Sequence, residues 1–328
     1  MENQDNKEKK LEKSQEKKSE KKEKQSESTD HITYWKIWYV RNPYKIPTTQ
    51  YTLKGYSVAA LRTNFYIKEL GLMLDGGLSA PNMTINHMLI THPHSDHTAN
   101  IPFHIYAYKE PDKIQIYVPK GIEKHLKEFI ESAYLLSSHT FPEDENIKRE
   151  ELFLYSFFDL IPVEAGQLIP IYIKKNKFYL EIFQCYHQVP CVGYGIYEVR
   201  KKLKEEYSKL SGKEIGELRK KGIEINYESS VKFLCYLGDT SKQIFEGEQW
   251  QKITQYKNII IECTFIKEEE LEQADKTNHI HWFALEPIID KYKDNNFILI
   301  HFSQRYDNSE LEAFFKEKNK SNVYPWIN

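Results

Sequence analysis

Hydrophobic and polar positions divide the chain into a polar amino-terminal segment and a longer part in which apolar runs recur. Residues 1–30 are almost entirely Lys, Glu, Gln, Asn and Ser, and such a segment buries too little apolar surface to offset its chain entropy. From residue 31 onward, short apolar runs alternate with stretches of helical period. The pattern predicts a disordered, charged Lys/Glu-rich tail over 1–30 and one folded domain over 31–328.

The apolar runs predict strands, and the amphipathic stretches predict helices. We expect strands at 32–40, 87–91, 113–118, 178–185, 192–199, 231–237, 258–265 and 296–301, and a hairpin over 64–75. We expect helices at 121–136, 201–221, 241–246, 281–292 and 309–318. Because strands and helices alternate, the fold class is mixed α/β or α+β, with β-sheets covered by helices.

Charge and cysteine content narrow the functional classes. The formal net charge of the 328 residues is −2, so any polyanionic substrate must meet a local positive site, which bound metal ions can supply. The four cysteines form no Cys-x-x-Cys pair and are expected to be buried thiols. No apolar stretch could cross a membrane, and the polar start lacks the apolar centre of a secretory signal. We expect an intracellular protein, cytoplasmic or nuclear, that is not secreted.

Three histidines and one aspartate lie within six positions directly after the apolar run 87–91. His92, His94, Asp96 and His97 offer the imidazole and carboxylate groups that zinc and similar divalent ions bind. Alternate residues of an extended loop point the same way, so His92 and His94 can hold one ion while the other two turn towards a second. A surface loop that is rich in His by chance is a poor alternative, since the chain has only 12 histidines. The motif predicts a metal-binding loop.

One loop cannot complete two metal sites, because each zinc ion takes about four ligands. Three further residues, His187, Asp239 and His301, each follow an apolar run that is predicted to be a strand. Loops at strand ends bring distant segments together over a rigid scaffold. These three residues are therefore candidates for the remaining ligands.

The order of the motifs carries a family resemblance. The motifs are, in order, His92-x-His94-x-Asp96-His97, His187 before Val-Pro-x-x-Gly-Tyr, Gly238-Asp239-Thr240, Glu262-x-Thr264-Phe265 and His301-Phe-Ser303-x-Arg305-Tyr306. This series resembles that of the ribonuclease Z family, the tRNA 3′-trailer endonucleases of the metallo-β-lactamase fold, and it spans about Asp75 to Tyr306. The resemblance implies an αββα sandwich with two central mixed β-sheets flanked by helices.

The resemblance also implies two Zn²⁺ ions, with Mn²⁺ or Fe²⁺ as alternatives because His and Asp ligands accept them too. Asp75 would orient a ligand histidine from behind, although the Asp-Gly-Gly sequence also fits a hairpin turn. The implied ligands of one ion are His92, His94 and His187, and those of the other are Asp96, His97 and His301, with Asp239 bridging the two.

Taken together, the residues and the resemblance suggest a dinuclear zinc-dependent phosphodiesterase that acts on RNA, namely pre-tRNA. Our hypothesis is that a metal-bound hydroxide attacks phosphorus in line and that Asp96 orients it or takes its proton. The resemblance implies that Glu262 pairs with His279, which would protonate the leaving oxygen, and His281 is a competing candidate. Ser303 and Arg305 either contact a phosphate oxygen or only stabilise the C-terminal loop.

Several alternatives stay open at the level of sequence. The chain could hydrolyse a smaller ester, such as a cyclic nucleotide phosphodiester or a thiolester, or it could be a non-catalytic subunit that kept the fold. Residues 201–230 are either a shortened substrate arm or a solvated helix pair, since the Gly-Pro-rich tip of the family's arm is missing. Enzymes of this resemblance are often dimers, so a homodimer is a further expectation.

Overall fold

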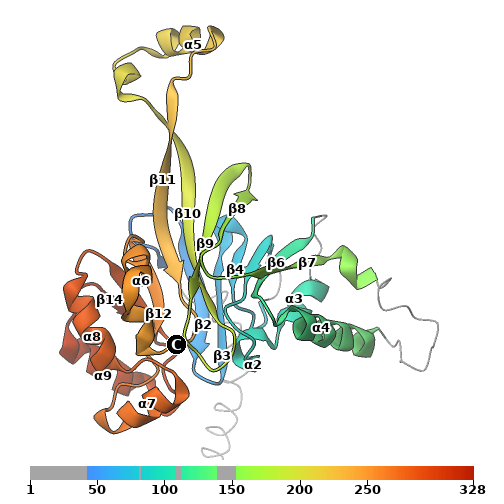
Figure 1. Ribbon diagram of the computed structural model, residues 1–328, viewed down its shortest axis with the longest axis vertical. Helices are drawn as coiled ribbons and strands as arrows, with labels where there is room; N and C mark the ends of the chain where they lie inside the picture. Colours follow the sequence, from blue (N-terminus) through green and yellow to red (C-terminus); the bar gives the residue numbers. More distant parts are fainter. Residues whose placement is uncertain (1–42, 81–82, 108–111, 139–152) are drawn as a thin grey trace, which may run out of the picture. The chain divides into compact units, whose positions relative to one another are not determined.

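Two seven-stranded mixed β-sheets form the centre of the computed structural model, which describes residues 43–80, 83–107, 112–138 and 153–328 (Figure 1). The compact unit discussed below spans Tyr44–Asn328. The predicted tail over 1–30, the predicted strand over 32–40 and the predicted boundary between tail and domain all lie outside the described residues.

The N-terminal sheet consists, in spatial order, of β1 (Tyr44–Lys45), β2 (Thr52–Val58), β3 (Arg62–Ile67), β4 (Leu72–Leu74), β5 (His87–Leu89), β6 (Ile114–Pro119) and β7 (Phe158–Val163). Neighbouring strands run antiparallel from β1 to β4 and parallel from β4 to β7. The predicted hairpin over 64–75 corresponds to β3 and β4, which a short 3₁₀ turn ending at Gly71 connects.

The C-terminal sheet repeats this succession of pairings. It consists, in spatial order, of β8 (Leu168–Ile173), β9 (Asn176–Gln184), β10 (Val192–Leu203), β11 (Asn226–Tyr236), β12 (Asn258–Glu262), β13 (Asn296–Ile300) and β14 (Val323–Pro325). Neighbouring strands are antiparallel from β8 to β11 and parallel from β11 to β14. The parallel strands of both sheets supply the residues discussed in the next subsection.

Helices flank the two sheets. Figure 1 shows the helices after residue 240 against the C-terminal sheet and those between residues 101 and 137 beside the N-terminal sheet. The α-helices are α2 (Ser95–Thr98), α3 (Ile101–Ala107), α4 (Glu123–Ser137), α5 (Gly212–Lys220), α6 (Gly247–Ile253), α7 (Leu271–Thr277), α8 (Trp282–Lys291) and α9 (Asn308–Lys318). The 3₁₀ turns are η2 (Lys68–Leu70), η4 (Phe153–Ser156), η5 (Glu205–Tyr207), η6 (Lys242–Phe245) and η7 (Glu268–Glu270).

The alternation of side chains along the central strands creates two hydrophobic layers. In β12, Ile260 packs into the core between the sheets, whereas Ile259 and Ile261 pack into the layer that contains Trp250 and Trp282 from the covering helices. Both faces are therefore buried, which explains why these strands read as continuous apolar runs. Each fully buried isoleucine contributes about 1.5–3 kcal/mol by leaving water. The predicted αββα sandwich is confirmed.

The prediction of a helix over 201–221 is wrong in part. Residues up to Leu203 continue β10, whose antiparallel pairing with β11 extends to Leu203↔Asn226, and only Gly212–Lys220 forms an α-helix. This part of the ribbon extends away from the sheet (Figure 1), so neither face shows the apolar alternation that reveals a strand. The strands β1, β2, β7, β8 and β14 were also not expected from the sequence. No helix among the described residues is long and apolar enough to cross a membrane.

Candidate metal centre

The residues expected to bind metal meet at one edge of the two sheets. Parallel strands end there, and the loops that follow them carry Asp75 after β4, His92 after β5, Asp239 after β11, Glu262 at the end of β12 and His301 after β13. The carboxyl ends of parallel strands are where such folds place ligands. The order of the strands therefore brings residues that lie far apart in the sequence into one cluster.

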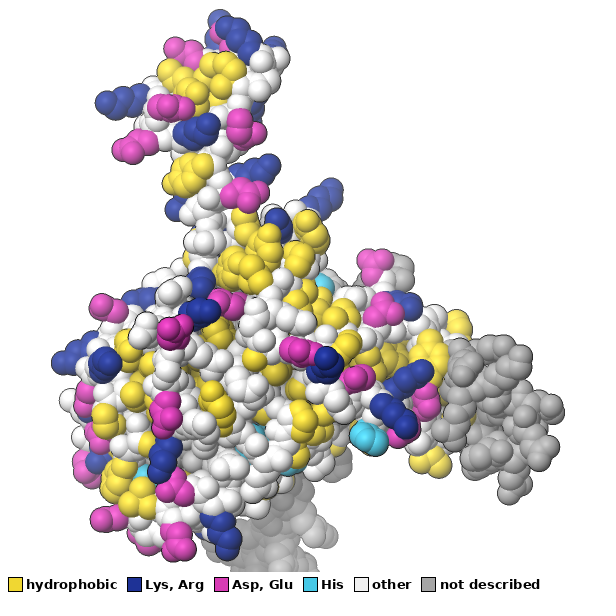
Figure 2. Space-filling model, viewed as in Figure 1, with side chains coloured by type: hydrophobic (Ala, Val, Ile, Leu, Met, Phe, Trp, Pro, Cys, Tyr) yellow, Lys and Arg dark blue, Asp and Glu magenta, His cyan; other side chains and the backbone are white. Residues whose placement is uncertain are grey.

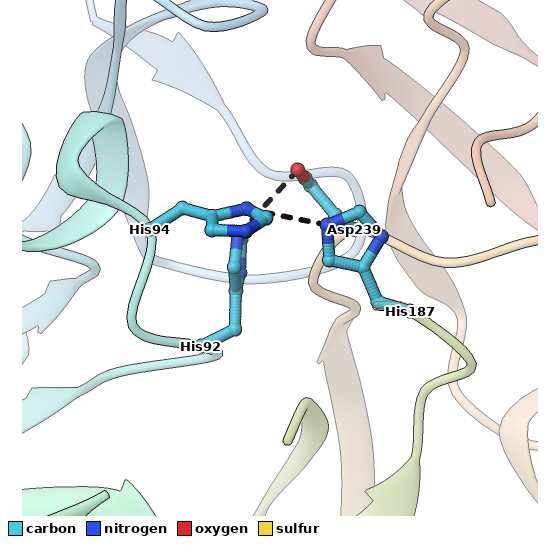
Figure 3. Close-up of side chains that lie close together, drawn as sticks. All are labelled: His92, His94, His187 and Asp239. Atoms are coloured by element: carbon cyan, nitrogen blue, oxygen red, sulfur yellow. Dashed lines mark hydrogen bonds and ion pairs between the residues drawn. The ribbon is translucent and has the colours of Figure 1, made fainter. Parts of the chain in front are cut away.

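A first group of side chains comprises three imidazoles and one carboxylate (Figure 3). The ligand atoms of His92, His94, His187 and Asp239 all lie within 4.8 Å of one another. Nε2 of His187 is 3.3 Å from Nδ1 of His94, and Nε2 of His92 is 3.5 Å from Oδ2 of Asp239. Separations of this size leave room for one ion between the four groups.

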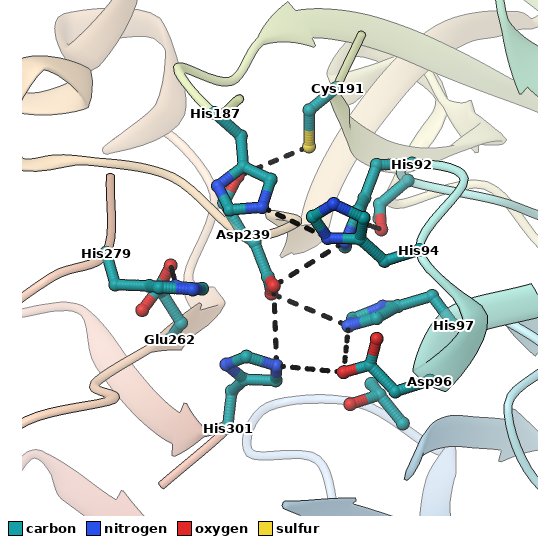
Figure 4. A network of polar contacts seen from close by, with 12 residues as sticks. His92, His94, Asp96, His97, His187, Cys191, Asp239, Glu262, His279 and His301 are labelled. Atoms are coloured by element: carbon teal, nitrogen blue, oxygen red, sulfur yellow. Dashed lines mark hydrogen bonds and ion pairs between the residues drawn. The ribbon is translucent and has the colours of Figure 1, made fainter. Parts of the chain in front are cut away.

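A second group lies on the other side of Asp239 (Figure 4). One ligand atom from each of Asp96, His97 and His301 lies within 4.8 Å of the others. Oδ2 of Asp96 is 3.4 Å from Nε2 of His301 and 3.5 Å from Nε2 of His97. Asp239 contacts this group as well, with Oδ2 3.3 Å from His301 and Oδ1 3.6 Å from His97. Its carboxylate thus stands between the two groups, where a bridging ligand would stand.

Two buried nitrogen atoms indicate that this cluster fits metal ions. Nε2 of His92 and Nε2 of His97 are inaccessible to solvent, and within the described residues neither has a hydrogen-bond partner. A buried polar atom without a partner costs about 1–3 kcal/mol. Both atoms face Asp239, and a cation there would satisfy them (Figure 4). The donor set of neutral imidazoles and carboxylates is the one that zinc, manganese and iron accept.

The protonation states of the cluster residues also fit a metal site. Burial lowers the pKa of His92 well below its ordinary value, and the neighbouring His97 adds to this effect, so His92 is neutral. Burial would raise the pKa of Asp239, but His301 and His97 outweigh it and hold this pKa below its ordinary value. Burial would likewise lower the pKa of His97, but the carboxylates around it raise that pKa to about 10. The carboxylates around His97 therefore favour positive charge at this position, whether a proton or a metal ion carries it.

Asp75 lies behind the cluster and is fully buried. Its Oδ2 is 2.7 Å from Nδ1 of His97, and it accepts hydrogen bonds from the backbone N–H and the hydroxyl of Thr91. The hydroxyl of Tyr236 also donates to this carboxylate. Because β4 and β5 are parallel, Asp75 does not lie in a hairpin turn, which removes the alternative that its Asp-Gly-Gly sequence left open.

Glu262 has an equivalent place behind the opposite side of the cluster. Its Oε1 is 2.8 Å from Nδ1 of His279, and the backbone N–H groups of Thr240 and Ile280 donate to the two carboxylate oxygens. The hydroxyl of Thr264 donates to Oε2 over 2.5 Å. Glu262 is fully buried, whereas the ring of His279 is partly exposed beside His301 (Figure 4).

The remaining sequence candidates lie differently. His281 caps α8: its Nδ1 accepts from the N–H of Phe283, and its Nε2 donates to the carbonyl of Lys267. Within the described residues, no polar contact joins Ser303 or Arg305 to the histidine cluster. The guanidinium of Arg305 is mostly exposed and lies 3.6 Å from the carboxylate of Glu270.

Two glycines and the strained backbone of two predicted site residues shape the loops, and sequence reasoning missed the glycines and the strain. A Cβ atom on Gly77 would lie 1.7 Å from the carbonyl oxygen of Asp96, and one on Gly238 would lie 2.6 Å from Cβ of Thr91. Asp75 and His301 adopt left-handed backbone conformations, with φ of 55° and 63°. Such strain in residues other than glycine persists where the surrounding structure holds it, often at functional sites. The Gly-Gly pair after Asp75 was the available signal.

The two sheets, their flanking helices and the His/Asp cluster define a metal-dependent hydrolase of the metallo-β-lactamase fold. The metallo-β-lactamase fold protein YhfI from Bacillus subtilis superimposes with a TM-score of 0.51 at 14% identity, over 83% of this chain and 94% of that one. The short form of human tRNase Z gives a TM-score of 0.50 at 15% identity, over 84% and 96%. These likenesses support the fold. No protein-family model matches the chain.

Sequence comparison gives the family. The chain is 30% identical over 281 residues to the chloroplastic tRNase Z TRZ2 of Arabidopsis thaliana, a match that covers 82% of this chain and 73% of the relative. It is 27% identical over 270 residues to tRNase Z TRZ1 of the same plant, covering 80% and 89%. The chain belongs to the ribonuclease Z family, also named tRNase Z.

Proposed function

We propose that this protein is a dinuclear zinc-dependent endoribonuclease that cleaves pre-tRNA at the 3′ trailer. The observation that carries the proposal is the position of Asp239 between two groups of His and Asp ligands, each with separations suited to one ion. The names of the plant relatives, tRNase Z, support tRNA as the substrate class. Intact ligand groups also argue against a fold-retaining subunit without activity.

The residues named above would hold two ions, His92, His94 and His187 one of them and Asp96, His97 and His301 the other, with Asp239 shared. When bound, two divalent ions lower the pKa of water and neutralise negative charge on the attacking and leaving oxygens of a phosphodiester. Zn²⁺ is the ion we propose, and elemental analysis of purified protein would distinguish it from Mn²⁺ and Fe²⁺.

Asp96 would orient the attacking water molecule. Its carboxylate contacts both His97 and His301 and is largely buried. Burial would raise the pKa of Asp96, but the neighbouring His301 and His97 outweigh it and keep this pKa below its ordinary value. An ionised carboxylate accepts hydrogen bonds only. Asp96 is thus suited to orient a water molecule through a hydrogen bond, whereas its low pKa makes it a weak acceptor of the proton.

His279 would protonate the leaving oxygen. Burial would lower the pKa of His279, but the charge of Glu262 and its hydrogen bond outweigh burial and raise this pKa to about 9. The imidazole is therefore protonated near neutral pH and can donate from Nε2, while Nδ1 stays bound to Glu262. His281 is a weaker candidate, because its Nδ1 caps α8 and its Nε2 donates to the carbonyl of Lys267.

The β10–β11 ribbon is proposed as the substrate arm. It ends in α5, whose first turn is fixed by a capping box between Ser211 and Glu214 and which has no buried residue. Basic and acidic side chains are interspersed along the ribbon and its tip (Figure 2). Phosphate contacts from basic side chains would supply sequence-independent affinity. The basic residues between positions 200 and 221 of this ribbon are Arg200, Lys201, Lys202, Lys204, Lys209, Lys213, Arg219, Lys220 and Lys221.

Two further contributions belong to the proposal. Ser303 and Arg305 would contact a phosphate oxygen only if Arg305 leaves Glu270, which its exposure permits.

A homodimer is the proposed assembly, supported by the exposed apolar side chains of Phe103 on α3 and of Phe129 and Leu136 on α4. Light scattering would measure the mass of the assembly, and a monomer at micromolar concentration would contradict the dimer.

The deciding experiment compares labelled pre-tRNA with bis-p-nitrophenyl phosphate. We expect cleavage of both by wild type, and loss of both in Asp239→Ala. The matched control is Asp275→Asn, because this aspartate of α7 is exposed and pairs with Lys242. Activity on the small ester alone would overturn the tRNA assignment and favour a small-ester hydrolase. Fewer than one metal ion per chain, with no activity on either substrate, would favour a non-catalytic subunit.

A further inference from the structure

Two threonine hydroxyls stand between a carboxylate and a histidine of the proposed metal centre. Oγ1 of Thr91 lies 3.1 Å and 3.0 Å from the two carboxylate oxygens of Asp75 and 3.0 Å from Nδ1 of His92. Oγ1 of Thr264 lies 2.5 Å from Oε2 of Glu262 and 3.0 Å from Nδ1 of His301. Both threonines are buried, so water does not compete for these contacts.

Each carboxylate therefore serves two imidazoles, one directly and one through a threonine. Asp75 contacts His97 over 2.7 Å and reaches His92 through Thr91. Glu262 contacts His279 over 2.8 Å and reaches His301 through Thr264. In both arrangements the carboxylate and the distant histidine follow neighbouring parallel strands, β4 and β5 in one sheet and β12 and β13 in the other.

The chemistry of these groups fixes the direction of the hydrogen bonds. A carboxylate only accepts, so each threonine hydroxyl donates its single proton to the carboxylate. The threonine oxygen can then only accept from the histidine, which places the imidazole proton on Nδ1. Nε2 is left with its lone pair, and it faces Asp239 at 3.5 Å from His92 and at 3.3 Å from His301. This is the tautomer that binds a metal ion through Nε2.

We infer that Thr91 and Thr264 are positioning residues, each of which fixes the tautomer and ring orientation of one metal-binding histidine. Because His92 belongs to one ligand group and His301 to the other, each threonine supports a different metal position. The inference rests on the proposed metal centre. Partners of this kind typically account for 10–100-fold in metal affinity.

The test uses Thr91→Val and Thr264→Val, which remove the hydroxyl and keep the branched shape, beside Thr91→Ser and Thr264→Ser, which keep the hydroxyl. Thr254→Val is the matched control, because its hydroxyl only bonds a carbonyl of the same helix end. Zinc affinity is measured on purified full-length protein by competition with a chromophoric chelator. We expect each Val variant to bind one of its two zinc ions 10–100-fold more weakly, and each Ser variant to regain most of the affinity.

A second measurement does not depend on the variants folding. In zinc-loaded wild type, ¹⁵N NMR of the imidazoles should show His92 and His301 protonated on Nδ1. Protonation on Nε2, or wild-type zinc affinity at both positions in both Val variants, would overturn the inference and leave the metal centre intact. If wild type binds fewer than one zinc ion per chain, the metal centre and this inference fail together.

Discussion

Oε1 of Glu262 lies 2.8 Å from Nδ1 of His279. The two residues lie beside the ligand cluster, and neither belongs to the metal-binding loop that carries His92 and His97. The carboxylate is fully buried, whereas the ring of His279 is partly exposed, so the imidazole can meet substrate while its other nitrogen is held. The ligand atoms of Asp239, His279 and His301 also lie within 4.8 Å of one another, so a mutation of His279 has to distinguish proton donation from metal binding.

His279→Ala should lower kcat for pre-tRNA by roughly 10²–10⁴-fold, the usual contribution of a general acid. The loss should be much smaller for bis-p-nitrophenyl phosphate, because nitrophenolate leaves without protonation. Metal content, measured by elemental analysis, should stay at two ions per chain. His281→Ala is the comparison and should cost about 1 kcal/mol of stability through the lost helix cap. Loss of metal in His279→Ala would show that the residue is a ligand.

Gly77→Ala should displace the metal loop. The added Cβ would lie 1.7 Å from the carbonyl oxygen of Asp96, which belongs to backbone that a side-chain rotation cannot move. We expect a loss of about 1–3 kcal/mol in the free energy of unfolding, with reduced metal content. Gly216→Ala on the exposed α5 has no atom within 4 Å of the new Cβ and should stabilise that helix slightly. Unchanged metal binding in Gly77→Ala would mean that the loop tolerates the shift.

Replacing residues 204–224 by a tight turn should affect the two substrates differently. This deletion removes α5 and most of the basic residues of the ribbon but leaves the strand pairs that lead to the cluster. We expect kcat/KM for pre-tRNA to fall by about ten-fold or more at moderate salt, because each lost phosphate contact weakens RNA binding. Hydrolysis of bis-p-nitrophenyl phosphate should remain. Equal kcat/KM values for pre-tRNA before and after the deletion would contradict the assignment of the arm.

His104 on α3 predicts a pH effect on stability that is independent of the metal centre. Burial lowers the pKa of His104 to about 4, although its hydrogen bond to the carbonyl of Leu78 opposes this effect. The unfolded state therefore binds more protons below about pH 6.5, so the stability that this residue contributes is complete above that pH and is lost as the pH falls towards 4. The loss should amount to about 2 kcal/mol between pH 7 and pH 5.

Urea unfolding of the metal-free protein at the two pH values would measure this loss. His104→Gln cannot titrate, so its stability should fall by about 2 kcal/mol less than that of wild type over the same interval. The exposed His125 on α4 offers the matched variant, His125→Gln, which should behave like wild type. The assignment is refuted if His104→Gln and wild type lose the same free energy.

The metal loop and the strand-end ligands could be predicted from the sequence because each follows a buried stretch of strand that reads as an apolar run. Asp239 and His301 could be predicted as ligands from that placement together with the resemblance in motif order. The roles of Thr91 and Thr264 could not be read this way, because a hydroxyl between two other side chains is a tertiary relation with no local pattern. The ribbon beyond Val199 was predicted as a helix because its charged residues, paired only with β11, show no strand alternation.

The ribbon joins the cluster end of the C-terminal sheet, at the pair Tyr194↔Tyr236, to a distant end at Leu203↔Asn226. Residues can be gained or lost in pairs at the far end without shifting the register near the cluster. The reach of the molecule can therefore change in evolution while its chemistry stays fixed. The length of the ribbon at its far end and the placement of the cluster residues at its near end are therefore independent, and selection can act on each alone.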